Sequence, residues 1–195
     1  MSRTYGRVEV SSREQWRAWL AEHHAELPGI WLVTYKKAEG DLHLPYADQV
    51  EEALCFGWVD SQALGLDERR SMLLMTPRKK GSGWSRPNKE RIERLTAAGL
   101  IEPAGRAVID RSVEDGSWTA LDAVENLEEP PDLAAALDAE PAARTHWDAF
   151  PRSPKRAALD WIRLAKRPET RARRIAETVA LAARNERANQ WKPKT

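Results

Sequence analysis

The sequence contains a single cysteine and no long apolar run. One cysteine cannot form an internal disulfide, and the apolar neighbours of Cys55 favour a small buried side chain over a reactive thiol. No stretch approaches the roughly 20 apolar residues that a membrane-spanning helix needs. The first ten residues also lack an apolar core of signal-peptide length. We therefore expect a cytoplasmic protein without a membrane segment.

Recognisable catalytic and metal-binding patterns are missing as well. The four histidines do not form a familiar constellation with Cys55 or with a serine motif. His23 and His24 are adjacent on an expected helix, so their side chains diverge, and no cysteine pair is present. We expect no cofactor and no metal. A non-enzymatic protein is favoured, and an enzyme acting on a small anionic substrate remains an alternative.

The composition is that of a globular protein. Of the 195 residues, 42% are hydrophobic and 31% are charged, which favours a folded chain over a disordered one. Nine tryptophans stand beside only two phenylalanines. Because tryptophan is large and seldom fully buried, we expect some of the nine to line clefts.

Charge is balanced over the whole chain but unevenly placed. The net charge is +1, whereas residues 101–150 hold 3 Lys or Arg against 12 Asp or Glu, and residues 151–195 hold 13 against 4. Two interpretations stay open. The acidic middle and the basic end pair with each other, or the basic end meets an external anion such as nucleic acid.

Strand and helix patterns alternate in the first part of the chain. Ser11-Ser12 followed by Glu14-Gln15 has capping-box chemistry and predicts a helix over about 12–25. The other expected elements are a strand at 30–35, a helix from 46 to 56 that Gly57 ends, a hairpin of strands 58–64 and 69–76, and an edge strand at 8–10.

Only helices are expected beyond residue 86. They cover 86–98, 103–113, 132–138, 141–150, 154–166 and 168–187, and most carry a proline near the first turn. Residues 128–131 suggest a linker. The predicted fold class is α+β, with a small antiparallel sheet and helices in residues 1–127 followed by an all-α domain in residues 128–195.

The segment from Thr76 to Asn88 is the most informative part of the sequence. It joins the last strand to a helix, with Ser85 placed as N-cap and Pro87 in the first turn. Free backbone N–H groups, the helix dipole, glycines and the cations around Arg78 are the ingredients of an anion site. The alternative is a capped helix that follows a solvated basic loop.

Other residues could complete such a site. Trp58 and Asp60 alternate onto one face of a strand, although Asp60 could instead partner an arginine such as Arg78. Lys166 and Arg171 lie where two helices join, where pairing with acidic residues is the alternative. The full candidate set for an unidentified small anion is Lys36, Lys37, Trp58, Asp60, Arg78, Trp84, Ser85, Asn88, Lys166 and Arg171.

Four motifs in order resemble a known family. They are residues 53–61 (ALCFGWVDS), 76–78 (TPR), 82–88 (SGWSRPN) and 165–175 (AKRPETRARRI). Over roughly residues 25–185 the chain is similar to the YdeI/OmpD-associated, or bacteriocin-protection, OmdA-type family. The resemblance implies a YjbR/CyaY-like N-terminal domain and a helical C-terminal domain. It further implies a role in protection against bacteriocins or envelope stress. Independently of the resemblance, we expect an unidentified small anionic ligand or a protein as partner, with nucleic acid as a further possibility.

Overall fold

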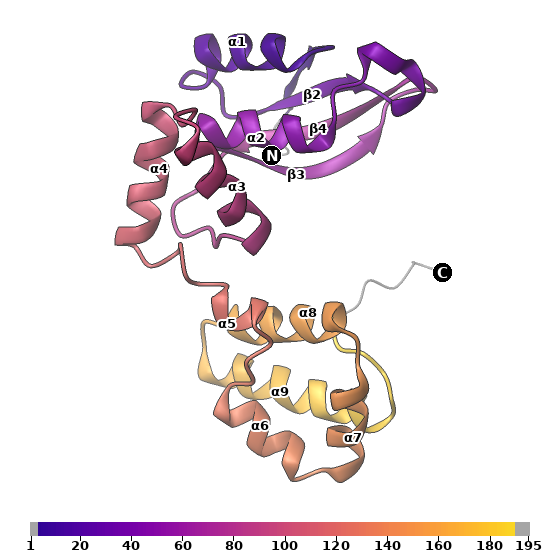
Figure 1. The fold of residues 1–195 in the computed structure, drawn as a ribbon. Coiled ribbons are helices and arrows are strands. Elements are labelled where there is room, and N and C mark those ends of the chain that lie inside the picture. Colours follow the sequence, from indigo (N-terminus) through magenta and orange to yellow (C-terminus); the bar gives the residue numbers. More distant parts are fainter. Residues whose placement is uncertain (1–3, 190–195) are drawn as a thin grey trace. The chain divides into compact units, whose positions relative to one another are not determined.

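The computed structural model describes residues 4–189. The chain divides into two compact units, Met1–Thr119 and Ala120–Thr195. The first contains a sheet with helices and the second only helices, so the predicted α+β class is confirmed (Figure 1). None of the helices in residues 4–189 is long and apolar enough to cross a membrane.

A four-stranded sheet forms the centre of the first unit. Its strands are β1 (Gly6–Glu9), β2 (Ile30–Tyr35), β3 (Trp58–Gly65) and β4 (Arg70–Pro77), in the order β1-β2-β4-β3. The pairs β2–β4 and β3–β4 are antiparallel, as expected, but β1 runs parallel to β2. The sheet is therefore mixed and not antiparallel throughout. Helix α1 (Arg13–His23) connects β1 to β2, and such a crossover returns the chain in the same direction.

Helices α1 and α2 (Tyr46–Cys55) build the core of this unit. Trp16 of α1 is fully buried, and its indole N–H donates to the carbonyl of Gln49 in α2 at 3.0 Å. Leu32 and Leu73 pair across β2 and β4 and belong to the same buried cluster. Cys55 is buried too, and burial raises the pKa of its thiol to about 11, which fits the predicted packing role.

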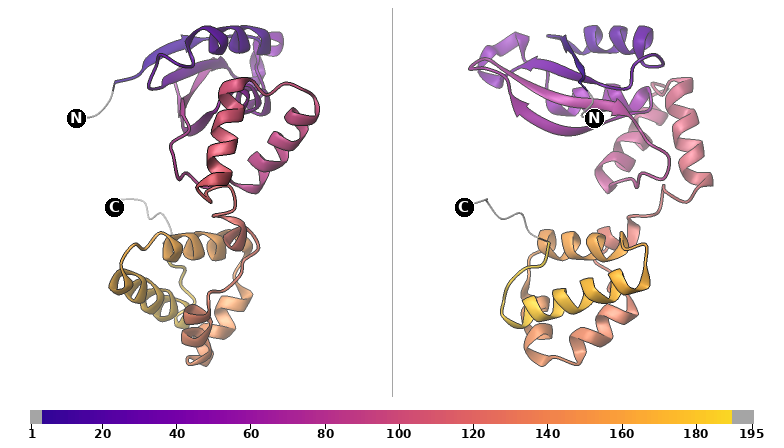
Figure 2. Two further views of the ribbon diagram at one scale, coloured as in Figure 1. Left: turned by 90° about the vertical axis from the view of Figure 1, so that its left-hand side faces the viewer. Right: turned by 180° about the vertical axis from the view of Figure 1, so that it is seen from behind.

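Most expected boundaries are confirmed. Ser12 caps α1 by accepting from the backbone N–H of Gln15, and Gly57 adopts the left-handed conformation that ends α2. Near one end of the sheet lie α3 (Arg86–Ala97) and α4 (Pro103–Glu114), as the right view of Figure 2 shows. A 3-10 helix, η1 (Lys37–Leu42), follows β2 in a segment for which no helix or strand was expected.

The second unit packs helices around its own core. They are α5 (Asp122–Glu125), α6 (Pro131–Asp138), α7 (Pro141–Ala149), α8 (Arg152–Arg163) and α9 (Pro168–Ala183). Leu133, Leu137, Trp147 and Ile162 are its most buried large side chains. The short helix α5 falls in a stretch that the sequence left without an element.

Acidic and basic segments of the second unit pair with each other. Glu125 is buried and accepts hydrogen bonds from Arg156, while Arg152 lies nearby. Asp132 binds Arg171 through both carboxylate oxygens, at 2.6 and 2.8 Å. Internal pairing, one of the two interpretations of the charge pattern, is therefore what these residues adopt.

Strand β3 forms one edge of the sheet. Its outer half, from residue 61 onward, is exposed to solvent. The pairing with β4 shifts between Asp60 and Ala63, where a β-bulge interrupts the ladder.

Candidate functional site at the strand-to-helix junction

The side chain of Arg78 is folded back into the protein at the end of β4. Its backbone N–H donates to the carbonyl of Gly57 at 2.9 Å, and its carbonyl accepts from Arg111 at 3.3 Å. The guanidinium Nη2 donates to the carbonyl of Gly83 at 2.5 Å, and only 6% of the residue is exposed. The loop between β4 and α3 therefore closes over its own arginine.

Tryptophan rings form the floor under this guanidinium. The central carbon of the Arg78 guanidinium lies 3.7 Å from the ring centroid of Trp84, which is 1% exposed. Trp84 in turn contacts Trp118, with centroids 5.0 Å apart, and the ammonium of Lys89 lies 5.4 Å from the Trp118 ring. Cation–π attraction of this kind is strongest where water is excluded.

Within residues 4–189, no carboxylate forms an ion pair with the buried guanidinium of Arg78. Its Nε and Nη1 are buried and have no hydrogen-bond partner within residues 4–189. Burial lowers the pKa of Arg78 to about 10, against a weaker opposing effect of the Asp60 charge. A shift of this size corresponds to roughly 3 kcal/mol of unfavourable charge burial. An anion placed against these nitrogens would offset that free energy.

Asp60 faces the same region but is engaged by another residue. The hydroxyl of Tyr46 donates to Asp60 Oδ2 at 2.8 Å. Partial desolvation of its hydroxyl, and then this hydrogen bond, raises the pKa of Tyr46 to about 12. The charge of Asp60 acts on Arg78 at a distance, but no ion pair joins the two side chains among the described residues. The predicted Asp60–Arg78 partnership is therefore electrostatic and not a contact.

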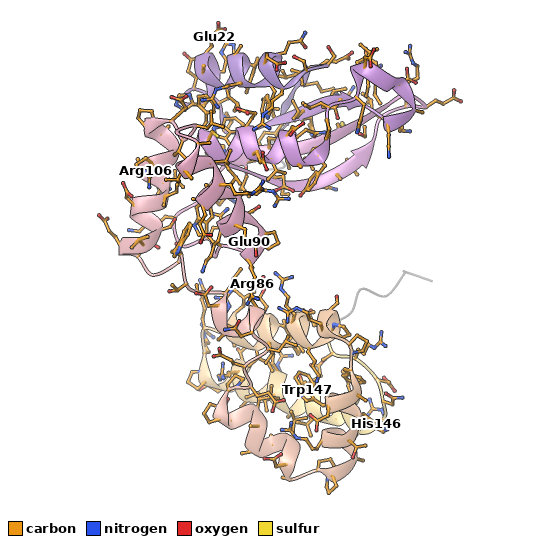
Figure 3. The ribbon with its side chains drawn as sticks, viewed as in Figure 1. Glu22, Arg86, Glu90, Arg106, His146 and Trp147 are labelled. Carbon is orange, nitrogen blue, oxygen red and sulfur yellow. The ribbon has the colours of Figure 1, made fainter. Side chains whose placement is uncertain are left out.

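Helix α3 begins beside Arg78 as the sequence predicts. Ser85 occupies the N-cap position, and its carbonyl accepts from the backbone N–H groups of Asn88 and Lys89 at 3.1 Å each. Its hydroxyl makes no capping hydrogen bond. Asn88 accepts from Arg91 at 3.0 Å through its side chain. Figure 3 labels Arg86 in this first turn.

Three of the candidate residues in the first unit lie away from the Arg78 junction or inside the core. Trp58 is 1% exposed, and its indole N–H donates to the carbonyl of His24 at 3.0 Å, so the ring is part of the core. Lys36 and Lys37 follow the end of β2, which pairs with the start of β4. They therefore lie at the opposite end of the sheet from Arg78, where Lys36 donates to the carbonyl of Asp67.

Two candidates belong to the second unit. Lys166 is exposed after α8, and Arg171 is held by Asp132. Neither is placed with the first-unit residues. What the structure brings together is a smaller set, which we call the Arg78 cluster: Tyr46, Asp60, Arg78, Trp84, Asn88 and Arg91.

Comparison with family models divides the chain into the same two regions as the fold. Residues 8–108, more than half of the chain, match the model described as a domain of unknown function, DUF8412. The chain belongs to this family. Residues 126–185 match the model described as bacteriocin-protection, YdeI or OmpD-associated. None of the curated proteins and none of the solved structures compared with the chain matches it.

The predicted resemblance to the YdeI/OmpD-associated family is thus confirmed for residues 126–185, a shorter range than the roughly 25–185 expected. Of the four motifs, only residues 165–175 fall inside the matched segment 126–185. The three earlier motifs, including the one that contains Trp84, lie within the DUF8412 segment. The Arg78 cluster is consequently a feature of the domain of unknown function, and the YjbR/CyaY-like fold of that domain stays a prediction.

Sequence reasoning missed two members of the Arg78 cluster, Tyr46 and Arg91. A signal existed for Arg91, because it follows Asn88 by three residues and shares its helix face. Tyr46 follows Pro45 at the start of α2, and nothing local links it to Asp60. Across residues 4–189 no group of three or more His, Cys, Asp or Glu side chains is arranged to hold a metal ion.

Proposed function

We propose that the first unit is a non-enzymatic binding domain that takes a small anion at the Arg78 cluster. The single observation that carries this proposal is the buried guanidinium of Arg78, which has no carboxylate partner among the described residues. Buried charges are normally paired, and a strongly perturbed pKa in an unpaired one is typical of functional sites. Natural sequences retain an unfavourable feature such as a buried, unpaired charge mainly where function requires it.

The chemistry of the cluster favours a carboxylate or phosphate group. A guanidinium offers a planar set of donors that matches two oxygens of either group, and here Trp84 fixes its plane. Lys79, Lys80 and Gly81 are exposed in the loop that follows Arg78, where the backbone N–H of Gly81 donates to Asp115 at 3.2 Å. Binding requires this loop to move, because Nε and Nη1 are covered.

The direct test is calorimetric titration with inorganic phosphate, simple dicarboxylates and nucleoside phosphates. The matched variants are Arg78→Met and Arg106→Met, which remove the same charge from a buried and an exposed position of the first unit. We expect binding that Arg78→Met abolishes and Arg106→Met preserves. Binding that survives in Arg78→Met, or no heat with any of these anions, would refute the site. Conversion of a bound anion to a product would indicate an enzyme instead.

Nucleic-acid binding through the C-terminal helices is less well supported. Arg152, Arg156 and Arg171, which belong to the basic C-terminal helices, are engaged by Glu125 and Asp132. A nucleic-acid site would show an affinity that falls steeply with salt concentration. We therefore include a short DNA duplex in the titration and compare its affinity at two salt concentrations.

At the level of the cell, we propose a role in protection against bacteriocins or envelope stress, exerted from the cytoplasm. The support is the description of the family that residues 126–185 match. A strain that lacks the protein should be more sensitive to bacteriocins, and the wild-type chain should restore resistance. Restoration by Arg78→Met as well would separate this role from anion binding, and fractionation of the cells would test the location.

A further inference from the structure

Strand β1 is the second edge of the sheet, and its outer side carries unused backbone groups. The N–H of Val10 donates to the carbonyl of Val33, which fixes the alternation of hydrogen bonds along the strand. Even-numbered residues therefore bond to β2, whereas Arg7 and Glu9 direct their N–H and C=O groups away from it. Gly6, Arg7 and Glu9 are exposed. An outward row of this kind can pair with another strand.

A cavity of about 390 Å³ adjoins this edge. Residues 4–8 form one wall, and the end of α1 together with residues 27–30 forms the rest. Its apolar lining includes Val8, Trp19, Leu27 and Ile30. The size lies within the range that accommodates a large side chain or a small ligand.

The aromatic wall of this cavity is held rigidly. The ring of Trp19 stacks on Trp16 with centroids 5.4 Å apart and meets Trp58 edge-on at 6.1 Å. The opposite wall is fixed by Gly29, where a Cβ atom would lie 2.7 Å from the Thr76 methyl group. The cavity is therefore preformed beside the open edge.

Arg7 and Glu9 place charges of opposite sign on the outer face of β1. Side chains alternate along β1, so that Val8 packs against the core while Arg7 and Glu9 project from the other face. Glu9 is already bound by Tyr35 and Arg70. Arg7, by contrast, has no hydrogen-bond or ion-pair partner in the part of the chain that the structure describes.

We propose that β1 receives an extended peptide segment of a partner protein as a fifth strand. An apolar side chain of that segment enters the cavity against Trp19 and Leu27, and a neighbouring acidic side chain pairs with Arg7 on the opposite face. Backbone hydrogen bonds provide the affinity, and the adjacent apolar and acidic residues provide the specificity. This surface shares no residue with the Arg78 cluster, so the proposal goes beyond the anion site.

Capped pentapeptides of the pattern Thr-Val-Glu-Phe-Thr are the probes, titrated into the full chain and followed by backbone amide NMR. The expected shifts concern β1, Trp19 and residues 27–30. Replacing the peptide phenylalanine by alanine should abolish binding. Replacing its glutamate by lysine should weaken binding about two- to fivefold or more, the scale of a cross-strand charge pair.

Two exposed leucines provide matched protein variants. Leu27 and Leu64 are 37% and 39% exposed and lie at the β1 and β3 edges respectively. Leu27→Asp places a charge in the cavity that the peptide phenylalanine enters and should weaken binding about tenfold or more, whereas Leu64→Asp should leave it unchanged. Arg7→Pro removes an outward N–H that an edge strand can spare, and it should weaken binding more than Arg7→Gln does.

Several results would overturn the proposal. They are a flat titration with all the pentapeptides, equal affinity in Leu27→Asp and Leu64→Asp, shifts centred on β3, or a concentration-dependent dimer that occupies β1. Arg78→Met should bind the peptides normally, so that failure here and failure of the anion site remain distinguishable.

Discussion

The guanidinium of Arg78 lies 3.7 Å above the ring of Trp84, and both residues are more than nine-tenths buried. Stacking of this kind stabilises a cation by about 2 kcal/mol when water is excluded. It does not supply the negative charge that a buried cation ordinarily requires. The pair therefore combines a favourable contact with an unfavourable burial, and the balance between them can be measured.

Arg78→Met should change the free energy of unfolding by no more than about 1 kcal/mol. Removing the buried charge relieves roughly 3 kcal/mol, while losing the ring contact and the hydrogen bond to Gly83 costs a similar amount. Trp84→Ala, in contrast, should cost about 3–5 kcal/mol, because it empties a buried aromatic site. Urea unfolding of both variants provides the comparison. A decrease of more than about 3 kcal/mol in the free energy of unfolding of Arg78→Met would indicate that the cation serves only to stabilise the fold.

Acid should weaken the second unit through Glu129. Burial raises the pKa of Glu129, but hydrogen bonds from Arg144 and Trp147 lower it more, and the net pKa lies below its ordinary value of 4.5. Because the folded pKa is the lower one, this carboxylate stabilises the fold above about pH 4.5 and loses that effect as the pH falls through the folded pKa.

Glu129→Gln should therefore flatten the dependence of unfolding free energy on pH as the pH falls below the ordinary glutamate pKa of 4.5. Glu177→Gln, an exposed substitution of the same type on α9, is the control and should retain the wild-type slope. Urea unfolding followed by circular dichroism at a series of pH values measures both. Equal slopes in the two variants would contradict the assignment to Glu129.

Gly105→Ala should destabilise the first unit by about 3 kcal/mol. A Cβ atom at Gly105 would lie 2.2 Å from the carbonyl oxygen of Cys55, so α4 would have to move away from the end of α2. Gly65→Ala is the matched control, because no atom lies within 4 Å of a Cβ at that position. The control should be neutral or slightly stabilising. Thermal unfolding of the two variants measures the difference.

Residues 120–195 should fold alone, and more stably than residues 128–195. The longer fragment retains α5, whose Val124 packs into the core of the second unit and whose Glu125 binds Arg156. The shorter one follows the domain boundary expected from sequence and leaves Arg152 and Arg156 without this carboxylate. Circular dichroism and urea unfolding of both fragments test the boundary. Equal stability would show that α5 contributes nothing to the unit.

Local signals accounted for most of the helices and strands. Ser12, Gly57 and the prolines at the starts of α3, α4, α6, α7 and α9 mark element ends through hydrogen bonding and backbone geometry that act within a few residues. Helix α5 was missed because four residues present no period. The parallel pairing of β1 depends on where the chain goes after α1, which is tertiary information.

The candidate site was predicted less well than the fold. Arg78 was expected among the cations of an anion site or, alternatively, of a solvated basic loop. It is instead buried under that loop, because the aromatic surface of Trp84 lies within its reach. The separation of Lys36 and Lys37 from Arg78 could have been predicted from the strand order. Antiparallel β2 and β4 finish at opposite ends of a sheet, so residues that follow them cannot meet. The contact of Tyr46 with Asp60 could not be foreseen, since it joins elements that are distant in sequence.

The β-bulge in strand β3 has a consequence for the behaviour of the protein at high concentration. A long regular edge strand would invite copies of the chain to add to one another and aggregate. The shift between Asp60 and Ala63 breaks the row of outward backbone groups and twists the exposed half of the strand. Edge strand β3 is thus protected against nonspecific pairing with strands of other molecules. The four-residue β1 remains as the edge at which selective strand pairing can occur.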